Sequence, residues 1–376
     1  MYRRILIAAT LLEISCFPLV AQAVDFQPRR TALNEAVPEL LAQNSSNDER
    51  VGELLRQGRD RLDKRDYAGA ISSYQQAAQL ERDNPRIYSG IGYIYVQQGN
   101  YSAAAEAYRQ AINLDGNNKA FRYGLAYSLV NAEELEAAVT AYNEIIRLDP
   151  NEVDAYLGLG GVLIRLEDYD RAADAYRRLT GISPNNAQAL EALGNLYLQQ
   201  EQYREARQVF QQVQQLYPDR SSLHLSLANL WLIEDNQEQA LQSLRRAVQL
   251  DPNNAEAQVQ LAEILSDRGQ AEEAFSHYLR AADADPDIAV AQAMLGETYL
   301  AREQYFQAVL AYRRLVRLLP ADPGAHYNLG LALWGQGFEQ EAISYVRQAQ
   351  SLYRQQDDTA SVERTEQLLE VWGVDS

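Results

Sequence analysis

The chain has 376 residues, of which 47% are hydrophobic, and it carries a formal net charge of −18. This acidity disfavours nucleic acid as a partner, because proteins bind phosphates largely through Lys and Arg. It also disfavours unaided docking on an anionic membrane. The single cysteine, Cys16, lies near the N-terminus. The rest of the chain therefore has no disulfide, no cysteine nucleophile and no Cys-ligated metal.

The first 23 residues have the pattern of an export signal. Two arginines precede a mostly apolar run over residues 5–20, and a small-x-small sequence follows at 21–23. We expect a signal peptide over 1–23 that is cleaved, which makes the protein exported, periplasmic or lumenal. An uncleaved membrane anchor is the alternative. A lipoprotein through Cys16 is less favoured, because Glu13 stands where a lipidation box has an aliphatic residue.

Residues 24–50 contain two prolines and the polar run Asn-Ser-Ser-Asn at 44–47. This composition predicts a flexible spacer, with room for a short helix near residues 33–41.

From residue 51 onwards, an alanine recurs every 34 residues without a slip. Such a spacing indicates one supersecondary unit repeated nine times without insertion or deletion. The nine alanines are Ala70, Ala104, Ala138, Ala172, Ala206, Ala240, Ala274, Ala308 and Ala342.

Other repeat positions vary just as little when the alanine is numbered position 20. Position 8 is always Gly or Ala, position 24 is Tyr in six repeats, and position 32 is Pro in six. Apolar residues at positions 4, 7 and 11, and again at 17, 20, 24, 27 and 28, follow the steps of two amphipathic helices. The small residues at 8 and 20 allow the two helices to pack closely, and a large side chain there would overpack.

The repeat resembles the tetratricopeptide repeat family, with clear copies at Tyr88-Ser-Gly-Ile-Gly-Tyr-Ile-Tyr95 and Leu193-Gly194 followed by Tyr197. The resemblance implies an all-α fold, a right-handed α-solenoid superhelix of paired antiparallel helices, A and B. The nine repeats would span 51–84, 85–118, 119–152, 153–186, 187–220, 221–254, 255–288, 289–322 and 323–356.

After the last repeat, Val362, Thr365, Leu369 and Trp372 fall at helical spacing beside charged residues. We expect residues 357–376 to form a capping helix and tail that cover the exposed face of the ninth repeat.

No catalytic constellation is evident, so we expect no enzyme, no cofactor and no bound metal. The three histidines do not cluster at metal-ligand spacing: His224 and His326 fall at packing position 4, and His277 lies on a B helix. The glycines are accounted for by positions 8 and 15, which leaves no phosphate-binding loop.

What remains is a binding surface. The resemblance implies that helix A lines a concave groove through positions 2, 5, 9, 12 and 13. Side chains of aromatic, amide or charged type at these positions are the candidates for contact with a partner peptide. They are Tyr93, Tyr123, Tyr127, Asn131, Arg165, Asn195, Asn229, Glu263, Tyr327 and Trp334. Leu157, Leu198 and Leu232 also occupy the groove, but neighbouring helices are an equally good reason for their apolar character.

Some relatives hold a C-terminal carboxylate with position-9 asparagines and nearby cations. Asn195 and Asn229 match those asparagines, but Glu191 and Glu263 stand where cations would be needed. A carboxylate clamp is therefore rejected, and the asparagines are interpreted as a ladder that bonds a peptide backbone. The acidic side chains of repeats 7 and 8 would suit a basic segment, or would simply face solvent.

The leading hypothesis is a non-enzymatic scaffold or assembly factor that holds a partner polypeptide in its groove. The alternative is a structural or oligomeric subunit of an export or photosynthetic-complex assembly machine, using its convex face and ends. The expected partner is a protein or peptide, with no nucleic acid, and with the membrane only through residues 1–23 if they are not cleaved.

Overall fold

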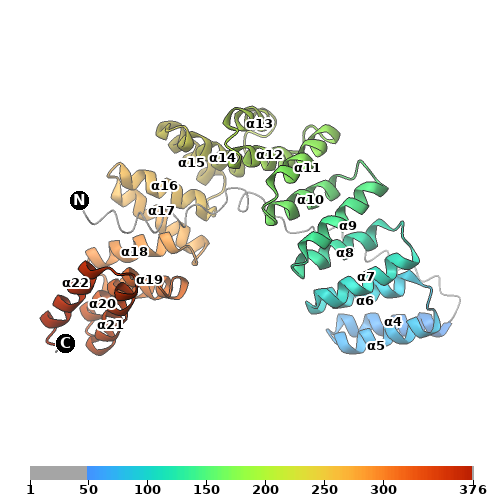
Figure 1. Ribbon diagram of the computed structural model, residues 1–376, viewed down its shortest axis with the longest axis horizontal. Helices are drawn as coiled ribbons and strands as arrows, with labels where there is room; N and C mark the ends of the chain where they lie inside the picture. Colours follow the sequence, from blue (N-terminus) through green and yellow to red (C-terminus); the bar gives the residue numbers. More distant parts are fainter. Residues whose placement is uncertain (1–48, 375–376) are drawn as a thin grey trace. The chain divides into compact units, whose positions relative to one another are not determined.

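The computed structural model describes residues 49–374, and these residues form nineteen helices and no strand, labelled α4 to α22 (Figure 1). The predicted signal peptide and nearly all of the spacer lie outside the described residues. The prediction of an all-α helical repeat fold is confirmed. Contacts divide the chain into two units, with the boundary in the sequence between Tyr217 and Pro218. Each unit is described by itself.

In the first unit, every helix packs against the next one along the chain. A helices alternate with B helices, and one A–B pair fills one repeat. The helices are α4 (Glu49–Asp63), α5 (Tyr67–Leu80), α6 (Pro85–Gln98), α7 (Tyr101–Leu114), α8 (Lys119–Asn131), α9 (Leu135–Leu148), α10 (Val153–Arg165), α11 (Tyr169–Ile182), α12 (Ala187–Gln199) and α13 (Tyr203–Leu216).

The second unit continues the same alternation, with a last helix, α22, that packs against α21. Its helices are α14 (Ser221–Ile233), α15 (Gln237–Leu250), α16 (Ala255–Asp267), α17 (Ala271–Ala284), α18 (Ala289–Ala301), α19 (Tyr305–Leu318), α20 (Pro323–Gly335), α21 (Glu339–Gln355) and α22 (Thr359–Val371). None of the described helices is both long enough and apolar enough to cross a bilayer.

Polar side chains cap the start of many of the helices, and a residue with a left-handed backbone follows each A helix. Asn118 accepts a hydrogen bond from the Phe121 backbone N–H at the start of α8, and Asn100 caps α7 in the same way. Position 15, after every A helix, has a positive φ, which breaks the helix and turns the chain. Glycine supplies it at Gly99, Gly269 and Gly337, whereas a non-glycine residue adopts it at Arg65, Glu133, Glu167, Glu201, Asp235 and Glu303.

The core of each repeat is built on the periodic small residues. All nine position-20 alanines are at most 3% exposed. Position 8 lies against the ring at position 24 of its own repeat: a Cβ added to Gly160 would lie 2.5 Å from the Tyr176 ring. In the first repeats, position 6 of the next repeat touches the other face of the ring, as Gly124 does with Tyr108. The recurring tyrosine is therefore a spacer between A helices, and it leaves no room for larger residues.

Candidate functional site

The A helices form one side of each unit. Within the first unit α6 contacts α8 directly, and within the second α18 contacts α20. No two consecutive B helices among the described residues contact each other as closely. Because the A helices approach more closely than the B helices, each stack curves locally with its A helices inside. We call the side chains at positions 2, 5, 9, 12 and 13 of these helices the A-helix face.

Three of the predicted tyrosines lie on the A-helix face of the first unit, and all are half-buried. The Tyr127 ring meets the Tyr101 ring edge to face, with centroids 6.3 Å apart and planes at 68°. Tyr93 packs against the same small cluster, whose buried members include Tyr108. The structure thus brings Tyr93 and Tyr127 together on one apolar surface, with Tyr101 of α7 as a support that the sequence analysis did not single out.

Tyr123 packs its ring against the core of repeats 3 to 5, while its hydroxyl is buried and makes no hydrogen bond to a described residue. Burial raises the pKa of this hydroxyl, and the nearby carboxylates of Glu152 and Asp154 raise it further. The group therefore remains a protonated donor. The Glu152 carboxylate is close enough to interact with the hydroxyl, although the strict geometry of a hydrogen bond is not met, so an incoming carbonyl would compete with that carboxylate for the donor.

Asn131 and Arg165 are already engaged inside the unit. The Asn131 amide donates to the Tyr127 carbonyl at 2.8 Å, on its own helix. The Arg165 guanidinium donates to the Glu133 carboxylate at 2.5 Å and to the Val130 carbonyl at 3.4 Å. Arg165 therefore ties the end of α10 to the turn of the preceding repeat, and a ligand would have to compete with that contact.

Asn195 is the most enclosed of the predicted residues, with only 2% of its surface exposed. Its side-chain amide makes no hydrogen bond to the described part of the chain. Leu157 and Leu198, also on the A-helix face, are 6% and 3% exposed. These two leucines are therefore core residues in this structure.

In the second unit, Asn229 on α14 repeats this arrangement. It is 9% exposed, and its amide likewise has no hydrogen-bond partner among residues 49–374. Beside it on the same helix, Leu232 and Ile233 are 37% and 41% exposed. The end of α14 thus offers apolar surface next to an unpaired amide.

The acidic residues of the A-helix face follow on α16. Glu263 is exposed as a residue, but its carboxyl is partly desolvated by neighbouring protein. This desolvation raises the pKa of Glu263 to about 7, and repulsion from Asp267 one turn later adds to it. Burial also raises the pKa of Glu256. The carboxyls of this helix are therefore in an environment that favours either a proton or an incoming cation.

Tyr327 and Trp334 lie on α20 and are half-buried. The Trp334 indole stacks on Trp372, the residue that follows the last helix, with centroids 4.1 Å apart and planes 1° from parallel. One face of Trp334 is therefore covered by the chain itself, and its place at position 12 is explained by packing.

Position 4 proved to have a role that periodicity did not reveal. In six repeats its side chain donates to the backbone carbonyl at position 32 of the preceding repeat. His224 and His326 bond to Pro218 and Pro320 at 2.8 and 2.9 Å. Tyr88, Gln258, Gln292 and Arg122 do the same with Arg82, Pro252, Pro286 and Gly116.

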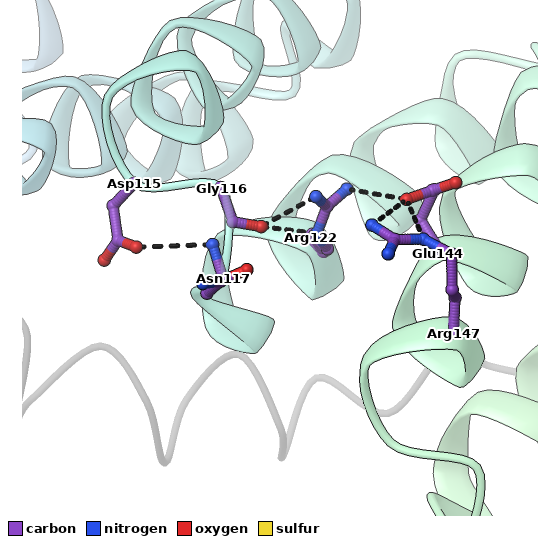
Figure 2. A network of polar contacts seen from close by, with 6 residues as sticks. All are labelled: Asp115, Gly116, Asn117, Arg122, Glu144 and Arg147. Atoms are coloured by element: carbon purple, nitrogen blue, oxygen red, sulfur yellow. Dashed lines mark hydrogen bonds and ion pairs between the residues drawn. The ribbon is translucent and has the colours of Figure 1, made fainter.

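Figure 2 shows this contact for Arg122, whose guanidinium also approaches Glu144 on α9 at 3.9 Å. The donors share no chemistry except an N–H or O–H at the same reach, which is why the pattern was missed. Two of the three histidines are thereby explained as structural. The third, His277, meets the Gln258 amide oxygen at 2.6 Å. No group of residues in the described ranges is arranged to hold a metal ion.

The tetratricopeptide repeat family matches residues 55–119, 123–187, 163–230 and 232–297. Further matches to this repeat cover 296–337 and 323–356, so the matches extend over most of the chain. The chain is a tetratricopeptide repeat protein. Such proteins bind protein or peptide partners and in general act as interaction scaffolds without chemistry of their own.

Individual relatives of this tetratricopeptide repeat protein are similar only in part. A TPR repeat-containing protein from Picosynechococcus sp. strain PCC 7002 is 42% identical over 65 residues, which is 17% of this chain and 17% of that protein. A solved tetratricopeptide repeat protein from Parabacteroides merdae is 20% identical, with a TM-score of 0.52 over 66% of this chain and 98% of its own. MamA from Desulfovibrio magneticus is 22% identical, with a TM-score of 0.42 over 46% and 97%. The likeness to the Parabacteroides merdae structure shows the fold alone.

Proposed function

We propose that this protein is an exported scaffold that holds an extended segment of a partner polypeptide against its A-helix faces. The observation that carries the proposal is the pair of buried, unbonded amides of Asn195 and Asn229. An amide can donate to a backbone carbonyl and accept from a backbone N–H, so it suits a peptide bond whatever the partner's side chains are. Both side chains are largely enclosed by protein, so water competes weakly for such a pairing.

Neighbouring groups support the same kind of ligand. In the first unit, the buried Tyr123 hydroxyl stays protonated beside the Glu152 and Asp154 carboxylates and is a further donor on the A-helix face. In the second unit, exposed Leu232 and Ile233 lie beside Asn229 and would cover an apolar side chain of the bound segment. The raised pKa of Glu263 favours a lysine or arginine further along that segment, because a cation would stabilise the ionised carboxyl.

The test is affinity capture from native envelope extract, with variants that change the amides and little else. Asn195→Ala with Asn229→Ala is expected to lose the proteins that the wild type recovers, while Tyr123→Phe weakens their capture. Gln208→Ala with Gln242→Ala, at exposed positions on B helices, is the matched control and should recover the full set. Identical recovery by the double asparagine variant and the control, with unchanged melting curves, would contradict the proposal.

Export is proposed from the pattern of the first 23 residues and is tested separately. Mass spectrometry of the protein from its natural source should find an N-terminus at Val24. An intact Met1 in a soluble fraction would contradict export.

A second candidate function is that of an oligomeric subunit that uses its outer face. It is favoured by two apolar side chains on a B helix, Phe306 and Leu310, which are 60% and 49% exposed.

A further inference from the structure

The last repeats carry exposed apolar residues at positions where the other repeats are polar or small. Phe306 and Leu310 occupy positions 18 and 22 of α19, and Phe338 occupies position 16 of the following repeat and is 54% exposed. All eight other repeats have a polar residue at position 22, and all eight have one at position 16. At position 18 the others have polar residues or, once, alanine. The repeat scaffold therefore does not require these apolar side chains, and leaving them exposed to water is unfavourable.

The three side chains lie in one region of the second unit. Phe306 and Leu310 are four residues apart on α19 and so share a helix face. Arg313 on α19 pairs with Glu341 in the first turn of α21 at 2.7 Å, and Phe338 is the residue directly before α21, so Phe338 belongs to a segment that lies close to α19. We call Phe306, Leu310 and Phe338 the outer patch.

Charge along α19 is divided between its ends. The helix contains three arginines, at 313, 314 and 317, and no carboxylate, whereas Glu303 lies in the turn just before it. Arg314 has no ion pair within the described residues, and Arg317 has only a loose one, at 3.3 Å to Asp287 with both side chains 67% exposed. Along this face of the chain, from Glu303 to Arg317, the side chains are thus acidic, then apolar, then basic.

This order is self-complementary about Leu310. When two copies of α19 lie antiparallel, the residues that face each other are those equally far from Leu310 on opposite sides. Phe306 of one copy then meets Arg314 of the other, four residues from the centre. Arg317, seven residues from the centre, faces the turn that precedes the other copy of the helix, and this turn carries Glu303. Each guanidinium has a favourable counterpart: an aromatic ring in the first pair and a carboxylate in the second. Leu310 meets its own counterpart on the symmetry axis.

We propose that the outer patch is a homodimer interface, in which α19 packs antiparallel on α19 of a second copy about a twofold axis at Leu310. A parallel arrangement would bring arginine against arginine, and an anionic membrane would be repelled by the net charge of −18. The chain already makes the aromatic contact internally, since the Arg302 guanidinium lies 4.4 Å from the Phe275 ring centre. This inference deepens the second candidate function and does not depend on the A-helix face, so its failure would leave the peptide-scaffold proposal untouched.

The interface is one helix wide, so we expect a weak dimer, with a dissociation constant on the order of 10 μM at low salt. Sedimentation velocity of the full chain, as purified from its natural source, should show the average mass rising from monomer to dimer over about 1–100 μM. Leu310→Glu should leave a monomer throughout, because two carboxylates would meet on the axis. Gln242→Glu, the same position on α15, is the matched control and should still dimerise.

A charge exchange gives the sharper test. Glu303→Arg or Arg317→Glu alone places like charges together at both ends of the interface, and each should weaken dimerisation at least about 10-fold. The double variant Glu303→Arg with Arg317→Glu restores opposite charges and should recover the dimer. Arginine is compatible with the backbone at this turn, because Arg65 adopts the same conformation at the same repeat position, with φ 59° against 58°.

Because all these side chains are exposed, the variants are expected to melt as the wild type does. A protein that stays monomeric at every concentration would overturn the proposal and leave the outer patch to a different protein. A dimer that survives Leu310→Glu would also overturn it. So would a double charge variant that folds and remains as weak as the single ones.

Discussion

The indole of Trp334 on α20 lies flat against the indole of Trp372 at the end of α22, with ring centres 4.1 Å apart. Both rings also pack against the core cluster of the last two repeats, which contains Leu329 and Leu333. The contact therefore joins the ninth repeat to the helix that follows it.

Trp372→Ala should destabilise the second unit by about 2 kcal/mol, because it removes the stacked ring and uncovers Trp334. All three tryptophans, at 231, 334 and 372, belong to this unit, so urea unfolding followed by the remaining tryptophan fluorescence reports on it selectively. Val371→Ser is the control, since that side chain is 83% exposed and its loss should change stability by less than about 0.5 kcal/mol. Equal midpoints for the two variants would contradict a capping role for Trp372.

Removal of residues 357–376 should have a larger effect than the single substitution. Leu369 is 7% exposed and Thr365 is fully buried, so α22 covers a surface of α21 that would otherwise face water. The shortened chain is expected to aggregate on concentration, as measured by light scattering, whereas Trp372→Ala remains soluble. A shortened chain that stays monodisperse would show that the surface covered by α22 does not cause aggregation when it is exposed.

The spacing of rings and small residues makes a separate prediction in the first unit. Gly158 lies against the Tyr142 ring, and Ala126 is at the position that meets the ring from its own repeat. Gly158→Ala should overpack this site and cost about 1–3 kcal/mol. Adding Ala126→Gly should recover part of that loss, so the two changes are expected to be non-additive by at least about 0.5 kcal/mol.

A glycine with free space beside it serves as the control in the same unit. Gly181 lies in α11 with nothing near its missing Cβ, so Gly181→Ala should stabilise the unit by about 0.5–1 kcal/mol through helix propensity alone. Circular dichroism during urea unfolding measures all four variants. Strict additivity at positions 126 and 158 would rule out the shared ring.

The sequence predicts the scaffold well because packing needs the same residue type at the same place in every repeat. The alanines at position 20 and the small residues at position 8 are buried as the period requires. The hydrogen-bonding role of position 4 was not predicted, because His326, Gln292 and Arg122 make the same hydrogen bond with different side-chain chemistry. A search for any donor at that position would have found it.

The candidate site was less predictable for a physical reason. The period fixes the direction of a Cα–Cβ bond but not the rotamer beyond it. Arg165 and Asn131 turn back to bond the backbone, and Trp334 turns to its neighbouring helix. Asn195 and Asn229, by contrast, remain unbonded at the places where the resemblance put them.

The left-handed turns at position 15 predict a simple way to stabilise the chain. Glu201 is exposed and has φ 58°, and a non-glycine residue is strained in that conformation. Glu201→Gly should raise the stability of the first unit by about 0.5–1 kcal/mol, after allowance for the extra freedom of glycine when unfolded. Glu205→Gly, four residues later inside α13, should instead lower it by about 1 kcal/mol. Loss of stability in both variants would show that the turn is not strained.

The pKa of Glu263, raised from 4.5 to about 7, predicts a pH-dependent effect on the second unit. Below about pH 4.5 the carboxyl is protonated whether the chain is folded or not, so it has no influence. Between pH 4.5 and 7 the unfolded chain loses the proton first, which lowers the free energy of unfolding, and the full loss is present above pH 7. Glu263→Gln removes a charge that the folded state disfavours.

Glu263→Gln should therefore raise the melting temperature at pH 8 and leave it unchanged at pH 4. The gain should stay below about 1 kcal/mol, because the side chain is exposed and water screens it. Asp267→Asn removes the neighbouring repulsion but not the surrounding protein, so it should give a smaller part of the same gain. Thermal melts of the variants at the two pH values test this prediction. An increase in melting temperature of equal size at pH 4 would mean that the glutamine acts through packing. No increase at pH 8 would mean that the carboxyl is solvated as freely in the folded protein as in the unfolded chain.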